Sequence, residues 1–208
     1  GARGIRRVLY STEPMAASCT NGNMEGWDEF WHYTLHNANL CWRDPGARRR
    51  HRYVPPGALD QELMKDAAPL GEGNAIARVN QRKAVFLGII PRNSTPKMPG
   101  QARRRCYNTL SRELGARLTH RENVYSLPAM RQLLRTHRVF VNLHKDCGEA
   151  DRPAEAVRFS ALLSAGRRII SERANPADEK QFSGLVTFVE LSQMGKAVAS
   201  ALAEDALE

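Results

Sequence analysis

The sequence predicts an α/β protein with a doubly wound parallel sheet of the Rossmann-like type and a reduced amino-terminal α/β segment. From residue 84 onward, short continuous apolar runs alternate with amphipathic segments, which is typical of strands covered on both faces by helices. Before that point the pattern is less regular, and two adjacent prolines at 55 and 56 interrupt it. We therefore divide the chain into residues 1–81, a reduced segment with a linker, and residues 82–208, the Rossmann-like domain.

In the second part, strands and helices alternate except that a loop follows the fourth strand. Glycines at 115 and 166 end two of the helices, and Pro128 lies in the first turn of another, where a missing N–H costs little. The predicted strands are 84–90, 116–120, 139–143, 167–171 and 185–189, and the predicted helices are 103–114, 127–137, 154–165 and 191–207. Because the strands are parallel, the loops that follow them, 91–101, 144–153 and 172–181, should line the ligand edge.

The amino-terminal segment has weaker signals. Residues 5–14 read as a strand that runs into a loop, and residues 25–38, "EGWDEFWHYTLHNA", as an amphipathic helix. Residues 39–44, "NLCWRD", are expected to form a short strand, and residues 68–82 a linker. Two strands and one long helix are too little for an independent domain of the usual size.

Composition limits the classes of function. The 208 residues are 42% hydrophobic and 25% charged, as in ordinary folded proteins, and no apolar run approaches the roughly 20 residues needed to cross a bilayer. Lys and Arg number 31 against 22 Asp and Glu, so the net charge of +9 favours an anionic partner. The chain starts at Gly1 without a secretory pattern, which we interpret as the product of processing.

The four cysteines, Cys19, Cys41, Cys106 and Cys147, form no CxxC pair. This spacing argues against a zinc ribbon and against a dense disulfide framework, and it favours a reducing compartment. We therefore expect an intracellular location, and the basic charge and the start of the chain favour a mitochondrial one.

Two clusters carry much of the positive charge. They can be solvated loops, or they can contact phosphate or nucleic acid. The arginines concerned are Arg48, Arg49, Arg50, Arg103, Arg104 and Arg105.

Other motifs give less. His32 and His36 have the i, i+4 spacing of two metal ligands but lack a third, so no metal is predicted. Cys147 near His144 could form a nucleophile pair, although a plain loop thiol is the simpler interpretation. Neither GxGxxG nor a phosphate-binding P-loop sequence is present.

The strongest constellation lies where the third and fourth strands of the second part end. A phosphate could bind to the N–H groups of a helix start there, and a carboxylate such as Glu172 could hold ribose hydroxyls. The alternative is an internal i, i+3 pair between Glu155 and Arg158. The predicted binding residues are His144, Lys145, Glu155, Arg158, Ser171 and Glu172, and no catalytic residue is assigned.

At these positions the sequence resembles the carboxyl-terminal donor domain of nucleotide-sugar-dependent glycosyltransferases of the GT-B type. The matching residues are Asn142, His144, Glu155, Arg158, Leu163, Gly166, Ile169, Ile170, Ser171 and Glu172. The resemblance implies that residues 82–208 hold the nucleotide diphosphate of an activated sugar.

Two departures from the family weaken the expectation of activity. A glutamate six residues after the Glu155 position commonly contacts the donor in the family, and Ala161 stands there. A segment of about 80 residues is also too small for the acceptor domain that the family has. We therefore expect an abridged, catalytically degenerate protein that needs no cofactor and serves as an accessory subunit among other protein subunits.

Two alternatives stay open. One is an active glycosyltransferase that uses a UDP- or GDP-linked sugar. The other is an RNA-binding component that uses the Arg clusters, and a contact with anionic lipid is expected on the same grounds of charge.

Overall fold

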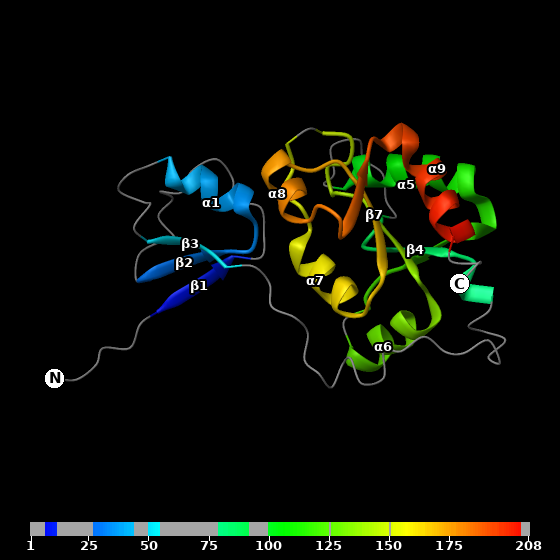
Figure 1. Ribbon diagram of the computed structural model, residues 1–208, viewed down its shortest axis with the longest axis horizontal. Coiled ribbons are helices and arrows are strands. Elements are labelled where there is room, and N and C mark those ends of the chain that lie inside the picture. Colours follow the sequence, from blue (N-terminus) through cyan, green and yellow to red (C-terminus); the bar gives the residue numbers. More distant parts are fainter. Residues whose placement is uncertain are drawn as a thin grey trace.

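The protein folds into two β-sheets that lie side by side, and the strands within each sheet are parallel (Figure 1). The computed structural model describes residues 7–11, 27–43, 50–54, 79–91, 100–124, 126–149 and 151–204. Most of the predicted linker 68–82 and of the loop 91–101, together with Arg48 and Arg49, lies outside these ranges.

The first sheet has three parallel strands in the order β1 (Val8–Ser11), β2 (Glu29–His32) and β3 (His51–Tyr53). The helix α1 (Leu35–Trp42) connects β2 to β3. It begins at Thr34, whose hydroxyl accepts a hydrogen bond from the backbone N–H of Asn37 at 3.2 Å.

Two predictions for this region were wrong. Residues 29–32 form a strand rather than the middle of a helix, and residues 39–42 of the strand predicted at 39–44 are instead the end of α1. The aromatic pair Phe30 and Trp31 favours a strand, and β2 pairs with a neighbour on each side, which outweighs the apparent helical period. Thr34 is the start signal that separates the strand from the helix.

The second sheet confirms the predicted fold class. Its five strands are all parallel, and their order is β5-β4-β6-β7-β8. The strands are β4 (Ala84–Leu87), β5 (Leu118–Arg121), β6 (Val139–Asn142), β7 (Arg168–Glu172) and β8 (Val186–Val189). The order reverses between β4 and β6, and ligands of such sheets bind outside the carboxyl ends of the strands near this point.

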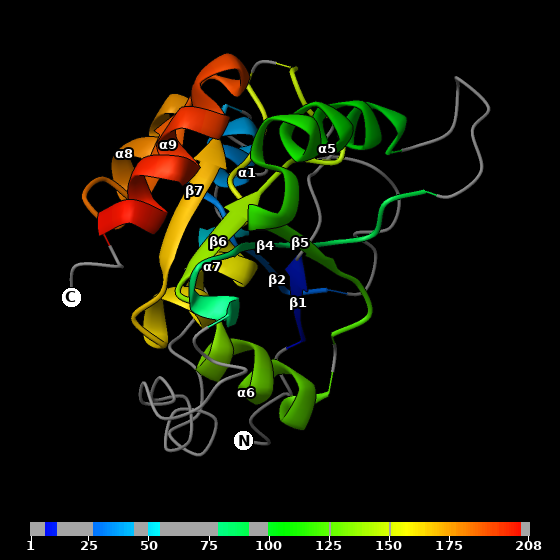
Figure 2. The same ribbon diagram turned by 90° about the vertical axis from the view of Figure 1, so that its right-hand side faces the viewer.

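Helices cover both faces of the second sheet (Figure 2). One face packs against α5 (Gln101–Leu114) and α9 (Leu191–Glu204), and the other packs against α6 (Leu127–Thr136) and α7 (Ala156–Ser164). Alternate residues of each strand enter the two cores, as Val85 and Phe86 of β4 do. Gly115 follows α5 with a φ of 55°, as its predicted role at the helix end requires.

One element was missed. Residues 172–181 were predicted to form a loop, but the helix α8 (Pro176–Gln181) lies within this range. Asn175 caps α8 by accepting the N–H of Ala177 at 2.9 Å, and Pro176 occupies its first position. This combination of an Asn cap and a proline is a helix start signal.

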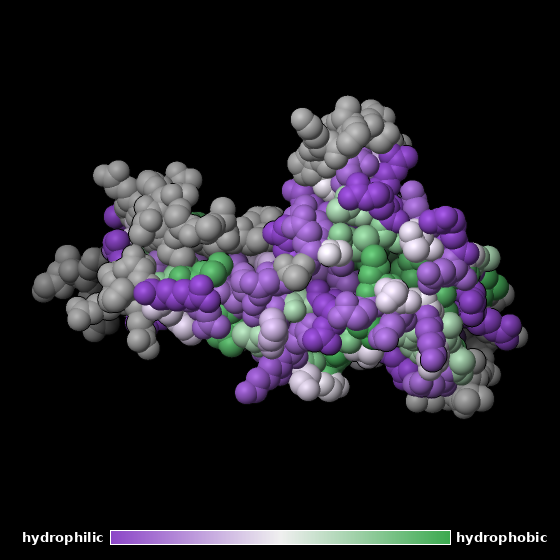
Figure 3. All heavy atoms as spheres, turned by 90° about the horizontal axis from the view of Figure 1, so that it is seen from above, coloured by the Kyte–Doolittle hydropathy of each residue, from purple (hydrophilic) through white to green (hydrophobic). Residues whose placement is uncertain are grey.

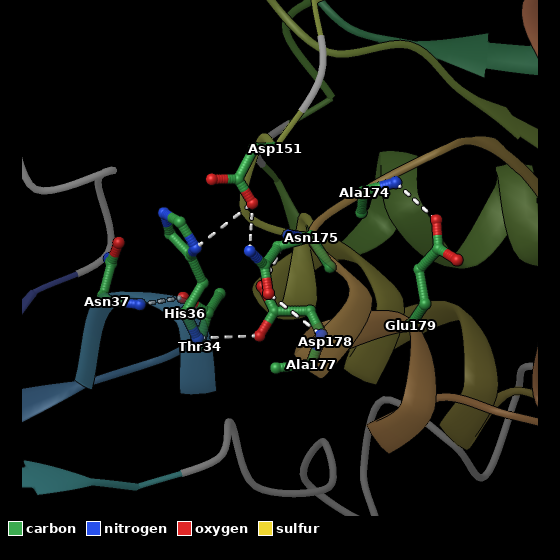
Figure 4. A network of polar contacts seen from close by, with 10 residues as sticks. Thr34, His36, Asn37, Asp151, Ala174, Asn175, Ala177, Asp178 and Glu179 are labelled. Carbon is green, nitrogen blue, oxygen red and sulfur yellow. Dashed lines mark hydrogen bonds and ion pairs between the residues drawn. The ribbon is translucent and has the colours of Figure 1, made fainter. Parts of the chain in front are cut away.

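The two sheets meet at a buried carboxylate (Figure 4). Asp178 of α8 is fully buried, and its Oδ1 accepts the backbone N–H of His36 in the first turn of α1 at 3.0 Å. Its Oδ2 accepts the N–H of Ala154 at 2.9 Å. Burial raises the pKa of Asp178, and these N–H groups oppose that shift. A side chain of α8 therefore binds the first turn of α1, the helix of the first sheet.

The surface is mostly hydrophilic on the face seen from above, with hydrophobic atoms showing in small areas between charged side chains (Figure 3). Within the described ranges, no helix has the length and apolar character needed to span a membrane.

Candidate functional site at the carboxyl edge of the second sheet

Two arginines approach the carboxyl edge of the sheet from its opposite faces. Arg103 is the third residue of α5 and Arg158 is the third residue of α7. Glu155, directly before α7, lies between them: its Oε1 is 3.7 Å from Nη2 of Arg103, and its Oε2 is 3.7 Å from Nη2 of Arg158. The i, i+3 pair predicted for Glu155 and Arg158 is therefore present, with a second cation added.

Arg103 is the more buried of the two cations. Its side chain is 11% exposed, against 23% for Arg158 and 32% for Glu155. Nη1 of Arg103 donates to the carbonyl of Ile89 at 3.4 Å, and burial lowers the pKa of its guanidinium. An arginine stays charged in proteins, so this cation is held in a poorly solvated place with one carboxylate beside it.

Asn142 links the ends of β6 and β7 to Arg158. The register pairs Asn142 with Ser171, and the Asn142 amide donates to the Ser171 hydroxyl at 3.0 Å. The Ser171 hydroxyl in turn donates to the carbonyl of Glu172 at 2.8 Å, and Nη1 of Arg158 donates to Oδ1 of Asn142. Ser171 is fully buried and bound to its neighbours, so it orients the strand ends.

Glu172 holds the turn that follows β6. Its two oxygens accept the backbone N–H of His144 and, at 3.0 Å, that of Gly148. Burial raises the pKa of Glu172, while these two N–H groups lower it. Glu172 was predicted to bind ribose hydroxyls. In the structure its carboxylate already accepts two hydrogen bonds from within the protein.

His144 lies under the same turn and is 4% exposed. The pKa of His144 is lowered to about 4, chiefly by burial. Glu155 raises this pKa, and Arg158 and Arg103 lower it. The ring of His144 is therefore neutral at neutral pH, and its Nε2 is buried without a hydrogen-bond partner. Such an atom is one of the few polar groups here that is available to a ligand.

The remaining predicted residues are spread out. The side chain of Lys145 is exposed, and its carbonyl accepts the N–H of Arg103 at 3.4 Å. Arg103 to Arg105 lie on α5 rather than in a loop, with Arg104 half-buried and Arg105 exposed. Arg50 is exposed and donates to the carbonyl of Trp27 at 3.0 Å. Whether the two Arg clusters contact an anion or nucleic acid stays a prediction.

A disulfide fastens the site turn to α5. Cys106 is one helical turn beyond Arg103, and it is bonded to Cys147, 41 residues later. This bond was not predicted from the sequence, because it depends on how α5 packs beside the end of β6. The bond also removes the thiol that the Cys147 nucleophile would need.

His32 and His36, for which no metal was predicted, do not lie on one helix. His32 lies on β2 and His36 on α1, so the i, i+4 spacing does not put them on one helix face. Arg103 was predicted only as a contact for an anion or nucleic acid, and Asn142 was named only as part of the family resemblance. Their signal was positional, because Asn142 ends a central strand and Arg103 stands in the first turn of a helix that begins at the ligand edge.

The chain is similar in structure to HepE (Alr3699) of Anabaena, in a crystal structure with UDP and glucose and in another with UDP-glucose. The TM-scores are 0.60 and 0.58, the identities 11% and 10%, and each match covers 96% of this chain and 63% of HepE. The chain thus spans less than two thirds of the length of HepE. This likeness confirms the Rossmann-like α/β fold. No protein family matches the sequence, and no curated protein matches it.

Proposed function

We propose that this chain is a glycosyltransferase-like domain that binds the diphosphate of a nucleotide sugar at the carboxyl edge of its second sheet and does not transfer the sugar. The observation that carries the proposal is the position of Glu155 between two arginines. A diphosphate has the same sign of charge as Glu155 and more acceptor oxygens, so it can take the place of this carboxylate between the guanidinium groups.

The surroundings suit such a ligand. Arg103 and Arg158 both stand in the first turn of a helix, where the positive end of the helix dipole adds to their charge. The buried Nε2 of His144 offers one more polar contact. HepE, which has the same fold, is bound to UDP-glucose in its crystal structure.

We propose that the sugar is not transferred because the carboxylates of Glu172 and Glu155 are already engaged within the protein. Glu172 accepts two backbone N–H groups and Glu155 pairs with two arginines, so within the described part of this cluster neither carboxylate is unengaged. His144, with a pKa of about 4, is a weak base. Ala161 of α7 supplies no hydrogen-bonding group. We therefore propose a structural or accessory role in a larger assembly, with a mitochondrial location as its setting.

An active glycosyltransferase is the second candidate, and one observation favours it. Glu155 is partly exposed, so a bound diphosphate would release it for a new partner. An RNA-binding role has less support, because Arg103 is buried and paired with Glu155.

Calorimetry with UDP and with UDP-glucose tests the proposal. We expect saturable binding of both, and Arg158→Ala should weaken it at least about tenfold, because charge-assisted hydrogen bonds contribute roughly 1.5–3 kcal/mol. The matched control is Arg168→Ala, which removes an arginine paired with Glu204 at the start of β7, the opposite end of the strand. Binding that is absent, or equally weak in both variants, would contradict the site.

Incubation of the same protein with UDP-glucose, followed by measurement of released UDP, distinguishes binding from transfer. The proposal expects no release of UDP above the rate without protein, with or without added sugar acceptors. Release of UDP that Arg158→Ala abolishes would establish the active enzyme instead.

A further inference from the structure

We propose that His32, Cys41 and His51 form a zinc site in the first sheet when the disulfide of Cys41 is reduced. One ligand atom from each residue lies within 4.8 Å of the other two, and all three residues are fully buried. The cluster is separate from the arginines at the edge of the second sheet, and it does not depend on the function proposed for them.

The β-α-β unit of the first sheet sets the positions of the three residues. His32 ends β2, Cys41 lies in the last turn of α1, and His51 begins β3. The two histidine rings are stacked, with their centroids 5.0 Å apart and an interplanar angle of 8°. Because the backbone of a sheet and its connecting helix fixes these side chains, the donor set is held in place before an ion arrives.

The two imidazoles share a hydrogen bond that an ion can replace. Nε2 of His32 is 2.7 Å from Nδ1 of His51, while Nδ1 of His32 is buried without a hydrogen-bond partner. Two nitrogens on a tetrahedral zinc ion are about 3.3 Å apart, so the rings need to separate by roughly 0.6 Å.

Oxidation state decides whether the sulfur can take part. Cys41 is disulfide-bonded in this structure and offers no thiolate. A dithiol reductant would break the S–S bond, each sulfur would gain one electron and one proton, and the reductant would close to its own disulfide. Zinc binding then displaces the proton of the Cys41 thiol.

The donor types select the ion. Thiolate and imidazole ligands suit zinc and exclude Mg²⁺ and Ca²⁺, which prefer oxygen. A water molecule can complete the tetrahedron. The ion would then join β2, α1 and β3 when Cys41 is reduced.

Cobalt substitution in the full-length chain tests this proposal. The protein is reduced with a dithiol, freed of it under nitrogen and titrated with Co²⁺, and Zn²⁺ is then added. We expect one equivalent of Co²⁺, a thiolate-to-cobalt charge-transfer band, the visible bands of a tetrahedral ion, and displacement by Zn²⁺. Oxidised protein should bind at least about 100-fold more weakly, since loss of an outer-shell partner alone costs 10–100-fold.

Variants locate the ion. Cys41→Ser should abolish the charge-transfer band, whereas the double variant Cys106→Ser, Cys147→Ser should retain it with unchanged stoichiometry. If the reduced wild-type protein binds no metal, or if the band survives Cys41→Ser, or if it disappears only in the double variant, the proposal is wrong. The comparison of reduced and oxidised wild-type protein decides the question even if Cys41→Ser does not fold. UDP binding plays no part in this readout, so the two proposals fail separately.

Discussion

Glu172 shows how a single side chain can differ in role from what its position suggests. The end of β7 is a ligand-binding position in folds of this type, yet both carboxylate oxygens of Glu172 face backbone N–H groups of the turn after β6. The turn contains His144 and Cys147, so Glu172 holds these two residues in position by binding the backbone of the turn.

We expect Glu172→Gln to lower the free energy of unfolding by about 1–3 kcal/mol. The amide of glutamine keeps the size of the side chain but turns one acceptor into a donor, which leaves one buried N–H of the turn without a partner. Urea denaturation followed by circular dichroism measures the change. Glu190→Gln is the control, because Glu190 is largely exposed after β8 and its loss should change stability by less than about 0.5 kcal/mol. Equal effects of the two variants would contradict the positioning role of Glu172.

The sequence placed the residues of the site better than it explained their contacts. Glu155, Arg158, Ser171, Glu172 and His144 do gather at one edge, because the alternation of strands and helices dictates where parallel strands end. Their partners could not be predicted. A hydrogen bond from a turn to a carboxylate 24 or 28 residues later has no periodic signature, and neither has the approach of Arg103 to Glu155.

At the scale of elements, the Cys106–Cys147 disulfide joins α5 to the turn after β6. Both ends of the link belong to the candidate site, since α5 carries Arg103 and the turn is held by Glu172. The bond closes a loop of 41 residues that contains β5, α6 and β6, and closing a loop of this length restricts the unfolded chain.

We expect the double variant Cys106→Ser, Cys147→Ser to lose about 2–4 kcal/mol of stability. Hydrogen exchange should also become faster at the backbone amides of residues 145–148 and of the first turn of α5, because the covalent tie between them is gone. Mass spectrometry of exchanging peptides measures this. The helix α9 packs on the same face and serves as the internal control. Loss of protection in α9 equal to that in the turn would indicate general destabilisation and not release of the site.

The elements that the sequence predicted correctly share strong local signals. The helix α6 has Pro128 in its first turn, and α5 ends at Gly115. The strand β2 lacked such a signal, because Glu29–His32 owes its conformation to pairing with β1 and β3, which are distant in sequence. The start of α8 at Asn175 could be recognised in the sequence, but the mostly polar composition of residues 172–181 favoured a loop.

For the whole molecule, buried neutral histidines set the response to acid. The pKa values of His32, His137 and His144 are each lowered to about 4, with burial as the first cause. Since the ordinary value is 6.5, the unfolded chain binds more protons than the folded one between pH 4 and 6.5. The stability that these groups contribute is fully present above about pH 6.5 and is lost as the pH falls toward 4. The raised pKa values of Glu172 and Asp178 act in the opposite direction.

His137 allows this response to be measured away from both proposed sites. It directly follows α6, is 2% exposed and contacts the hydroxyl of Thr136 at 3.0 Å. Between pH 7 and pH 5 it should contribute a loss of about 2 kcal/mol in the free energy of unfolding. Denaturation curves at these two pH values give the free energy of unfolding of each protein. The decrease in this free energy from pH 7 to pH 5 should be about 2 kcal/mol smaller in His137→Gln than in the wild type. Equal pH dependence in the two proteins would show that His137 is not held neutral.

The contact of Asp178 with α1 makes the folding of the first sheet depend on a segment that is synthesised much later. Asp178 binds α1 through the N–H of His36, 142 residues earlier in the chain. At roughly 5–20 residues per second, a ribosome needs about 7–28 s to make the residues between them. During this time α1 has the Thr34 cap but lacks its contact with Asp178, and the first sheet lacks the neighbour that anchors it. The part of the protein that is made first can therefore complete its structure only after α8 has been synthesised.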